Sequence, residues 1–243
     1  MDRLIYLSMS GAKASMQRQD VLTHNLANAS TNGFRAEMAA FRSVPIQGDG
    51  ATTRAFALES TLGYDSQSGP VAPTGNPLDV AMKGNAFLAV QALDGTEAYT
   101  RAGALQVNAE GLIVTSAGLP VLGDGGPITL PTGAAPEVAS DGTITAKVGN
   151  ARPQVVGRLK MVSPEAAMTR GTDGLFRAGD GELPADANAR LQSGALEGSN
   201  VSPIETMVAM IAAARQFEHQ MKMLQGAEQR EQAASKLLGP MGG

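Results

Sequence analysis

Glycine and proline are unevenly distributed along this chain of 243 residues, and their distribution limits which folds it can adopt. Residues 63–198 contain 21 of the 29 glycines and 10 of the 13 prolines. In a helix interior glycine costs about 1 kcal/mol and proline about 3 kcal/mol relative to alanine, so both interrupt long helices. Long helices are therefore expected only at the two ends of the chain, around a β-rich middle. Such a chain is expected to assemble through its ends rather than to form an enzyme around a pocket.

The first predicted helix runs from Asp2 to about Ala27, with no proline and a single glycine. Its apolar and small residues repeat at spacings of four and three, a coiled-coil-like pattern. This first seam consists of Ile5, Met9, Ala12, Met16, Gln19, Thr23 and Leu26, and a second stripe of Leu7, Ala14 and Val21. Two stripes indicate either several neighbours or one face on the chain's own core, and we predict subunit contacts at Ile5, Met9 and Met16.

The second predicted helix follows Ser202, which is expected to cap it. Proline at the first helical position and Glu205 at the third complete a capping box. Leu238-Gly239-Pro240 provides the stop. The seam of this helix consists of Met207, Met210, Ala214, Phe217, Met221 and Leu224, and all of these except Ala214 are predicted subunit contacts.

Between the helices, short apolar segments alternate with turn signals. Asp-Gly pairs at 94–95, 124–125, 141–142 and 173–174 are typical of hairpin turns. Strands are expected at 78–82, 87–90, 105–107, 112–114, 128–130, 143–146 and 155–162. The predicted fold class is α+β: long N- and C-terminal helices form a coiled-coil-like domain, and the centre is an irregular antiparallel all-β domain. The expected segments are 1–35 with the first helix, a connector at 36–75, the β domain at 76–198 and the C-terminal helix at 199–243.

Composition and motifs argue against several function classes. The net charge of −4, without a basic run, argues against nucleic-acid binding, and no stretch approaches the ~20 apolar residues of a membrane span. The longest apolar run at the start is four residues, too short for a cleaved signal peptide. With no cysteine and only His24 and His219, a metal site is not expected. Neither a nucleotide-binding loop nor a hydrolase motif is present, so no cofactor and no enzymatic activity are predicted.

Three sequence stretches resemble the signatures of the bacterial flagellar basal-body rod protein family. Residues 25–35 read Asn-Leu-Ala-Asn-Ala-Ser-Thr-Asn-Gly-Phe-Arg, residues 78–90 and 99–103 resemble its central β signature, and residues 196–201, 207–211 and 215–218 its C-terminal signature. The first match gives a further set of predicted subunit-interface residues, namely Asn25, Leu26, Asn28, Thr31, Gly33, Phe34 and Arg35. Within the family, the length of the connector and of the middle fits a proximal-rod member.

The resemblance implies a structural subunit of the torque-transmitting rod, assembled through its terminal helices. The implied partners are copies of itself, inner proximal and distal rod proteins, and the flagellar export apparatus. The implied location is the periplasmic part of the basal body, reached without a cleaved signal peptide and without membrane insertion. Two alternatives stay open: a distal rod subunit of the same family, and a secreted β-rich binding module.

Overall fold

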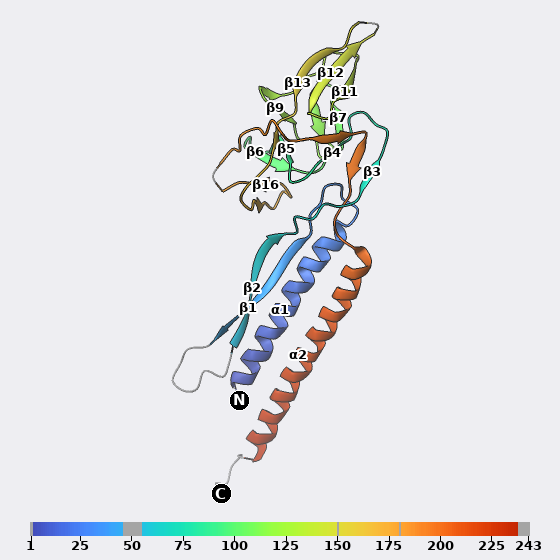
Figure 1. Ribbon diagram of the computed structural model, residues 1–243. Helices are drawn as coiled ribbons and strands as arrows, with labels where there is room; N and C mark the ends of the chain where they lie inside the picture. Colours follow the sequence, from blue (N-terminus) through green and yellow to red (C-terminus); the bar gives the residue numbers. More distant parts are fainter. Residues whose placement is uncertain (1, 46–54, 150, 180, 238–243) are drawn as a thin grey trace. The chain divides into compact units, whose positions relative to one another are not determined.

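The computed structural model describes residues 2–45, 55–149, 151–179 and 181–237, and the chain divides into two compact units (Figure 1). The helical unit comprises the described residues of Met1–Ala27, Glu37–Leu62 and Ser202–Gly243. The β unit comprises those of Asn28–Ala36 and Gly63–Val201. The signature segment, residues 25–35, is therefore shared between the units: its first three residues belong to the helical unit and the remainder to the β unit.

The described part of the helical unit contains two helices, α1 (Asp2–Ala27) and α2 (Pro203–Leu237). They lie side by side and run in opposite directions (Figure 1). A two-stranded sheet of β1 (Glu37–Pro45) and β2 (Ala55–Tyr64) accompanies them, and the last two residues of β2 belong to the β unit. Helix α2 begins at the predicted proline, whereas the predicted stop at 238–240 lies outside the described residues.

The predicted coiled-coil-like domain is wrong. The unit holds a β-sheet as well as the helices, and the methionines of the first seam do not lie between the helices: Met9 is 54% exposed and Met16 53% exposed. Among the helix residues whose burial is described, the buried ones are instead small or short side chains, namely Ser8, Ala12, Ala14, Ser15, Thr206, Ala213 and Ala227, together with Asn25 near the end of α1. At Gly11 the side chain of Gln220 on α2 packs against α1, and a Cβ added to Gly11 would lie 2.9 Å from Gln220 Cδ.

The physical reason is size. Small side chains let two helices come close, so the closest packing is at small residues and long methionine side chains remain outside it. The fold class that the structure supports is α+β, with one helix at each end of the chain and a β-rich centre.

The described residues of the β unit form sixteen short strands. They are β3 (Val71–Pro73), β4 (Val80–Met82), β5 (Phe87–Gln91), β6 (Glu97–Thr100), β7 (Leu105–Val107), β8 (Ile113–Thr115), β9 (Leu122–Gly123), β10 (Gly126–Pro127), β11 (Ala134–Val138), β12 (Thr143–Val148), β13 (Gln154–Arg158), β14 (Met161–Val162), β15 (Thr169–Arg170), β16 (Phe176–Arg177), β17 (Leu191–Ser193) and β18 (Ala195–Glu197). Their pairings are antiparallel.

Two sheets organise this unit. The larger has the strand order β14-β5-β6-β16-β15, and the second has the order β11-β12-β13. The four Asp-Gly pairs lie between β5 and β6, β9 and β10, β11 and β12, and β15 and β16, which are all antiparallel neighbours. Each pair thus marks a hairpin. The sequence does not predict nine of the strands, namely β3, β6, β9, β10, β11, β15, β16, β17 and β18. Residues 128–130, which it does predict as a strand, form only a single bridge, between Thr129 and Leu112.

Apolar side chains of the β unit form two buried clusters. The larger one is aliphatic and includes Val80, Leu88, Ile113, Ile144 and Leu191. The smaller one is aromatic and gathers Phe87, Tyr99 and Phe176, with Tyr64 packed against it. Phe87 and Phe176 meet edge to face at a centroid distance of 5.3 Å. Alternate residues of β5 face the two clusters, so this central strand connects both parts of the core.

Candidate functional site

The signature segment turns sharply before it joins the β unit. The Thr31 N–H donates to Asn28 O at 3.1 Å, and the Phe34 N–H donates to Thr31 O at 3.2 Å. Gly33 has a φ of +70°, and an added Cβ there would collide with the backbone carbonyl of Arg101. Its N–H donates to Glu197 O at 2.8 Å. Glycine is therefore required here both by the backbone conformation and by the close approach of a neighbouring chain segment.

Directly after this turn, Arg35 enters a buried cluster of charges. Arg35 Nη2 lies 2.7 Å from Glu197 Oε1. The other oxygen, Glu197 Oε2, accepts from Arg101 Nε at 2.8 Å and also from Arg101 Nη2. The side chains of all three residues are at most 2% exposed. We call Arg35, Arg101 and Glu197 the arginine–glutamate cluster.

Backbone groups hold the Arg101 and Glu197 side chains of this cluster. Arg101 donates to the carbonyl oxygens of Met82, Gly84 and Ala86 at 2.7–2.9 Å. Glu197 Oε1 also accepts from the Gly69 N–H at 3.1 Å. The carbonyls help to neutralise the second positive charge, which the single carboxylate does not balance.

Burial lowers the pKa of the Arg35 guanidinium below its ordinary value, and the nearby charge of Arg101 lowers it further. The carboxylate of Glu197 opposes this shift. Arginine nevertheless keeps its proton at physiological pH, so the cluster holds two positive charges and one negative charge.

A third arginine stacks over the signature segment. Arg170 Cζ lies 4.1 Å from the ring centroid of Phe34 and 5.4 Å from that of Phe176. Arg170 Nη1 donates to Arg35 O at 2.9 Å. Phe34 is 3% exposed, and the cation–π contact fixes its ring against β15 and β16.

Two asparagines hold the neighbouring backbone. In the β unit, Asn200 Oδ1 accepts from the Ala36 N–H at 2.7 Å, and its Nδ2 donates to the carbonyls of Asp65 and Gln67. In the helical unit, Asn25 exchanges two hydrogen bonds of 3.0 and 2.8 Å with the backbone of Glu37. Asn25 thus stands in for a paired strand residue where β1 begins.

The other predicted residues occupy varied environments. Leu26 and Asn28 are half-buried and Thr31 is exposed. Three predicted helix residues have about half of their surface exposed: Met9, Met16 and Met207. Four others are partly buried: Met210, Phe217, Met221 and Leu224. The side chain of Ile5 lies outside the described residues. Ser202 and Glu205 are exposed at the start of α2, where the Glu205 N–H donates to Ser202 Oγ at 3.5 Å and the Thr206 N–H to Ser202 O at 3.0 Å.

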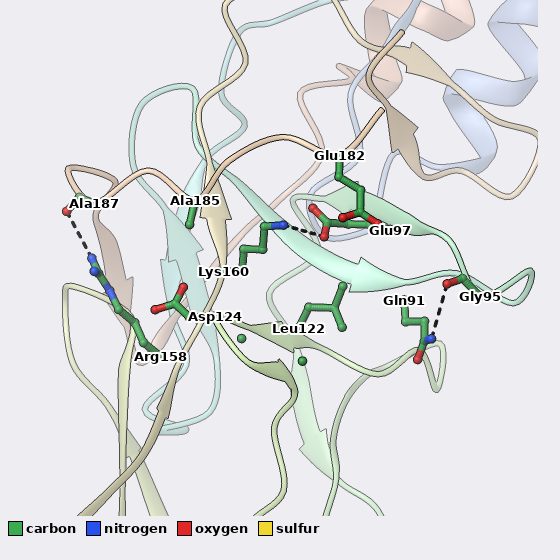
Figure 2. Close-up of a pocket in the computed structure, with 12 residues that line it drawn as sticks. Gln91, Gly95, Glu97, Leu122, Asp124, Arg158, Lys160, Glu182, Ala185 and Ala187 are labelled. Carbon is green, nitrogen blue, oxygen red and sulfur yellow. Dashed lines mark hydrogen bonds and ion pairs between the residues drawn. The ribbon is translucent and has the colours of Figure 1, made fainter. Parts of the chain in front are cut away.

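The β unit also has an open surface pocket of about 690 Å³, drawn in Figure 2. Three of its charged side chains form bonds within the protein: Lys160 Nζ lies 2.7 Å from Glu97 Oε2, and Arg158 Nη2 donates to Ala187 O at 3.2 Å. Tyr99 Oη donates to the other oxygen of Glu97 at 2.8 Å and accepts from the Leu183 N–H at 2.6 Å. These bonds tie the strands to the loop around 182–187, which is a structural use of the charges.

The two histidines do not form a joint site. His24 Nδ1 lies 3.3 Å from Glu37 Oε2, and His219 is exposed on α2. Within the described ranges, no group of three or more His, Cys, Asp and Glu side chains is placed to hold a metal ion. Over the same residues, neither α1 nor α2 is long and apolar enough to cross a membrane.

Each member of the arginine–glutamate cluster falls in a stretch that matches a separate flagellar family model. Residues 5–35 match the model for flagella basal body rod proteins, residues 81–146 the flagellar hook protein FlgE/F/G D1 domain, and residues 192–237 the flagellar basal body rod FlgEFG C-terminal model. The flagellar basal-body rod protein FlgF of Salmonella typhimurium is 46% identical over 98% of this chain and 99% of its own length. This chain belongs to the flagellar basal-body rod protein family.

This chain is also similar in sequence to other rod proteins of the family, to different degrees. FlgF of Escherichia coli is 44% identical over 98% of this chain and 99% of its own length. FlgG of Buchnera aphidicola from Acyrthosiphon pisum is 28% identical over 96% and 98%. This rod protein is therefore FlgF-like, and its similarity to FlgG is weaker.

The sequence predicts the signature stretches of the rod family but not the buried ion pairs between them. Arg101, Glu197 and Asn200 were recognised only as parts of matching stretches, without a role. One signal was available: each stretch carries a charged residue among small and apolar neighbours, a setting in which a buried charge needs a partner.

Proposed function

We infer that this chain is a structural subunit of the flagellar proximal rod and not an enzyme. The observation that carries this conclusion is the full-length similarity to FlgF, at 46% identity, together with matches to the rod models at both ends of the chain. The weaker similarity to FlgG argues for a proximal rather than a distal position in the rod.

We further propose that the subunit binds its neighbours through apolar side chains left exposed on α1 and α2. Met9 and Met16 on α1, and Met207, Val208 and Ile211 on α2, are each more than half exposed. Exposed large apolar side chains grouped on helices mark surfaces that gain free energy when a partner covers them. Met210, Phe217, Met221 and Leu224 are half-buried and are proposed to be completed by the same neighbours.

The proposed neighbours are copies of this chain and other rod proteins, in the periplasmic part of the basal body. The proposed route is the flagellar export apparatus, without a cleaved signal peptide. Methionine suits such contacts because its flexible side chain adapts to neighbours of slightly different shape, as a subunit between unlike rod segments requires.

A deletion strain complemented with variants tests this proposal. Met207→Asp places a charge at a half-exposed position of α2 and is expected to abolish motility and to leave isolated basal bodies without the distal rod in electron micrographs. Val155→Asp is the matched control, because Val155 is 70% exposed on β13 of the β unit and its change should leave motility intact. Full motility with Met207→Asp and with the equivalent change at Met16 would exclude this helix surface as a rod contact.

A further inference from the structure

We propose that the signature segment acts inside one subunit: the arginine–glutamate cluster anchors residues 28–36 as a structural part of the β unit and thereby joins the points at which the chain enters and leaves that unit. This assigns an intramolecular role to a motif whose match to the rod family had suggested a contact between subunits. The inference does not depend on the proposed rod contacts, because it concerns the isolated chain.

The last residues of the signature segment are already covered within one subunit. Gly33, Phe34 and Arg35 are buried within the β unit, with Phe34 3% and Arg35 1% exposed. Their partners, Glu197, Arg101 and Arg170, are residues of the same unit. Side chains that are already covered within one subunit have no surface left to offer a neighbouring subunit.

Charge balance is the second argument. Glu197 is the carboxylate that pairs with both Arg35 and Arg101. Without its charge, two buried guanidinium groups would keep only neutral partners: backbone carbonyls for Arg101 and the Ser68 hydroxyl for Arg35. Breaking a buried pair in this way typically shifts an unfolding or opening equilibrium by about 150- to 5,000-fold, far more than breaking an exposed pair does.

Chain connectivity is the third argument. Arg101 and Glu197 are 96 residues apart in the sequence. Arg35 is separated from Arg101 in the sequence by residues 37–62, which belong to the helical unit. The cluster therefore forms only when three distant segments are together. Around it, the Gly33 N–H bonds to Glu197 O, the Ala36 N–H to Asn200 Oδ1 and the Gly69 N–H to Glu197 Oε1. Loss of the cluster should open all three bonds together.

Amide hydrogen exchange on the full-length monomer tests this. In Glu197→Gln, the amides of Gly33, Ala36 and Gly69 are expected to exchange about 150- to 5,000-fold faster than in the wild type. The matched control is Asp173→Asn, which removes the carboxylate of a two-bond pair with Arg177 in the same unit. That pair is about one-third exposed, so its loss should change exchange at these three amides by less than about threefold.

Arg35→Lys is a milder variant that keeps the charge, and it covers the case in which Glu197→Gln unfolds the β unit altogether. It is expected to speed exchange at Gly33 and Ala36, with Arg177→Lys as its control. Unchanged exchange at these amides in both cluster variants would overturn the proposal, and a rod defect alongside unchanged exchange would place the cluster between subunits instead. A rod contact elsewhere on the helices would not alter either result, because the monomer is measured.

Discussion

The strictest test of the packing around the signature segment is Gly33→Ala. Gly33 combines two constraints: a φ of +70° and a backbone neighbour, the Arg101 carbonyl, that occupies the space of a Cβ. Gly118 has a φ of +80° in the same unit, but nothing lies within 4 Å of its added Cβ. Gly118→Ala therefore measures the cost of the backbone conformation alone, and the difference between the two variants measures the collision.

The expected magnitudes follow from these two terms. A left-handed conformation costs a residue with a Cβ about 1–2 kcal/mol, which is the expected loss for Gly118→Ala. Overpacking against a fixed backbone adds about 1–3 kcal/mol, so Gly33→Ala should lose about 2–5 kcal/mol in total. A loss of this size is a large fraction of the 5–15 kcal/mol that stabilises a typical domain.

Urea unfolding of the purified monomer provides the assay. Tyr64 and Tyr99 lie in the β unit and the chain has no tryptophan, so tyrosine fluorescence reports largely on this unit. Equal free energies of unfolding for Gly33→Ala and Gly118→Ala would refute the reasoning, since they would mean that the segment moves away from Arg101 without cost.

Three further outcomes are expected. Burial, with the hydrogen bond to Glu97 as a further cause, raises the pKa of Tyr99 from 10.0 to about 12. The neutral phenol therefore stabilises the fold below pH 10, and this stability is lost as the pH rises from about 10 to 12. Tyr99→Phe should flatten the decline of the unfolding free energy over that pH range. Phe176→Ala should cost about 3–5 kcal/mol in urea unfolding, because its 2% exposed ring fills the aromatic cluster, and a loss below 1 kcal/mol would contradict that packing. Gly11→Ala should stabilise α1 by up to about 1 kcal/mol and so raise the thermal midpoint, because the flexible end of Gln220 can move aside for the added methyl group. A lower midpoint would show that the Gln220 side chain does not move aside.

The relation between α1 and α2 shows where periodicity misleads. The spacing of Ile5, Met9 and Met16 indicates one face of α1, yet the residues buried against neighbours are small ones such as Ser8 and Ser15. A hydrophobic pattern reports which side chains avoid water, but it does not distinguish cover within the subunit from cover by another subunit.

By itself the sequence determined local structure and family. The capping signal at Ser202 and the absence of proline placed the helices, and Asp-Gly pairs marked the hairpins, because these features act between residues near one another in the chain. Only the tertiary structure decided that Arg35, Arg101 and Glu197 meet in one buried cluster. The energy that selects this contact is the cost of leaving a buried charge unpaired, and that cost arises only when the fold removes water from segments 96 residues apart.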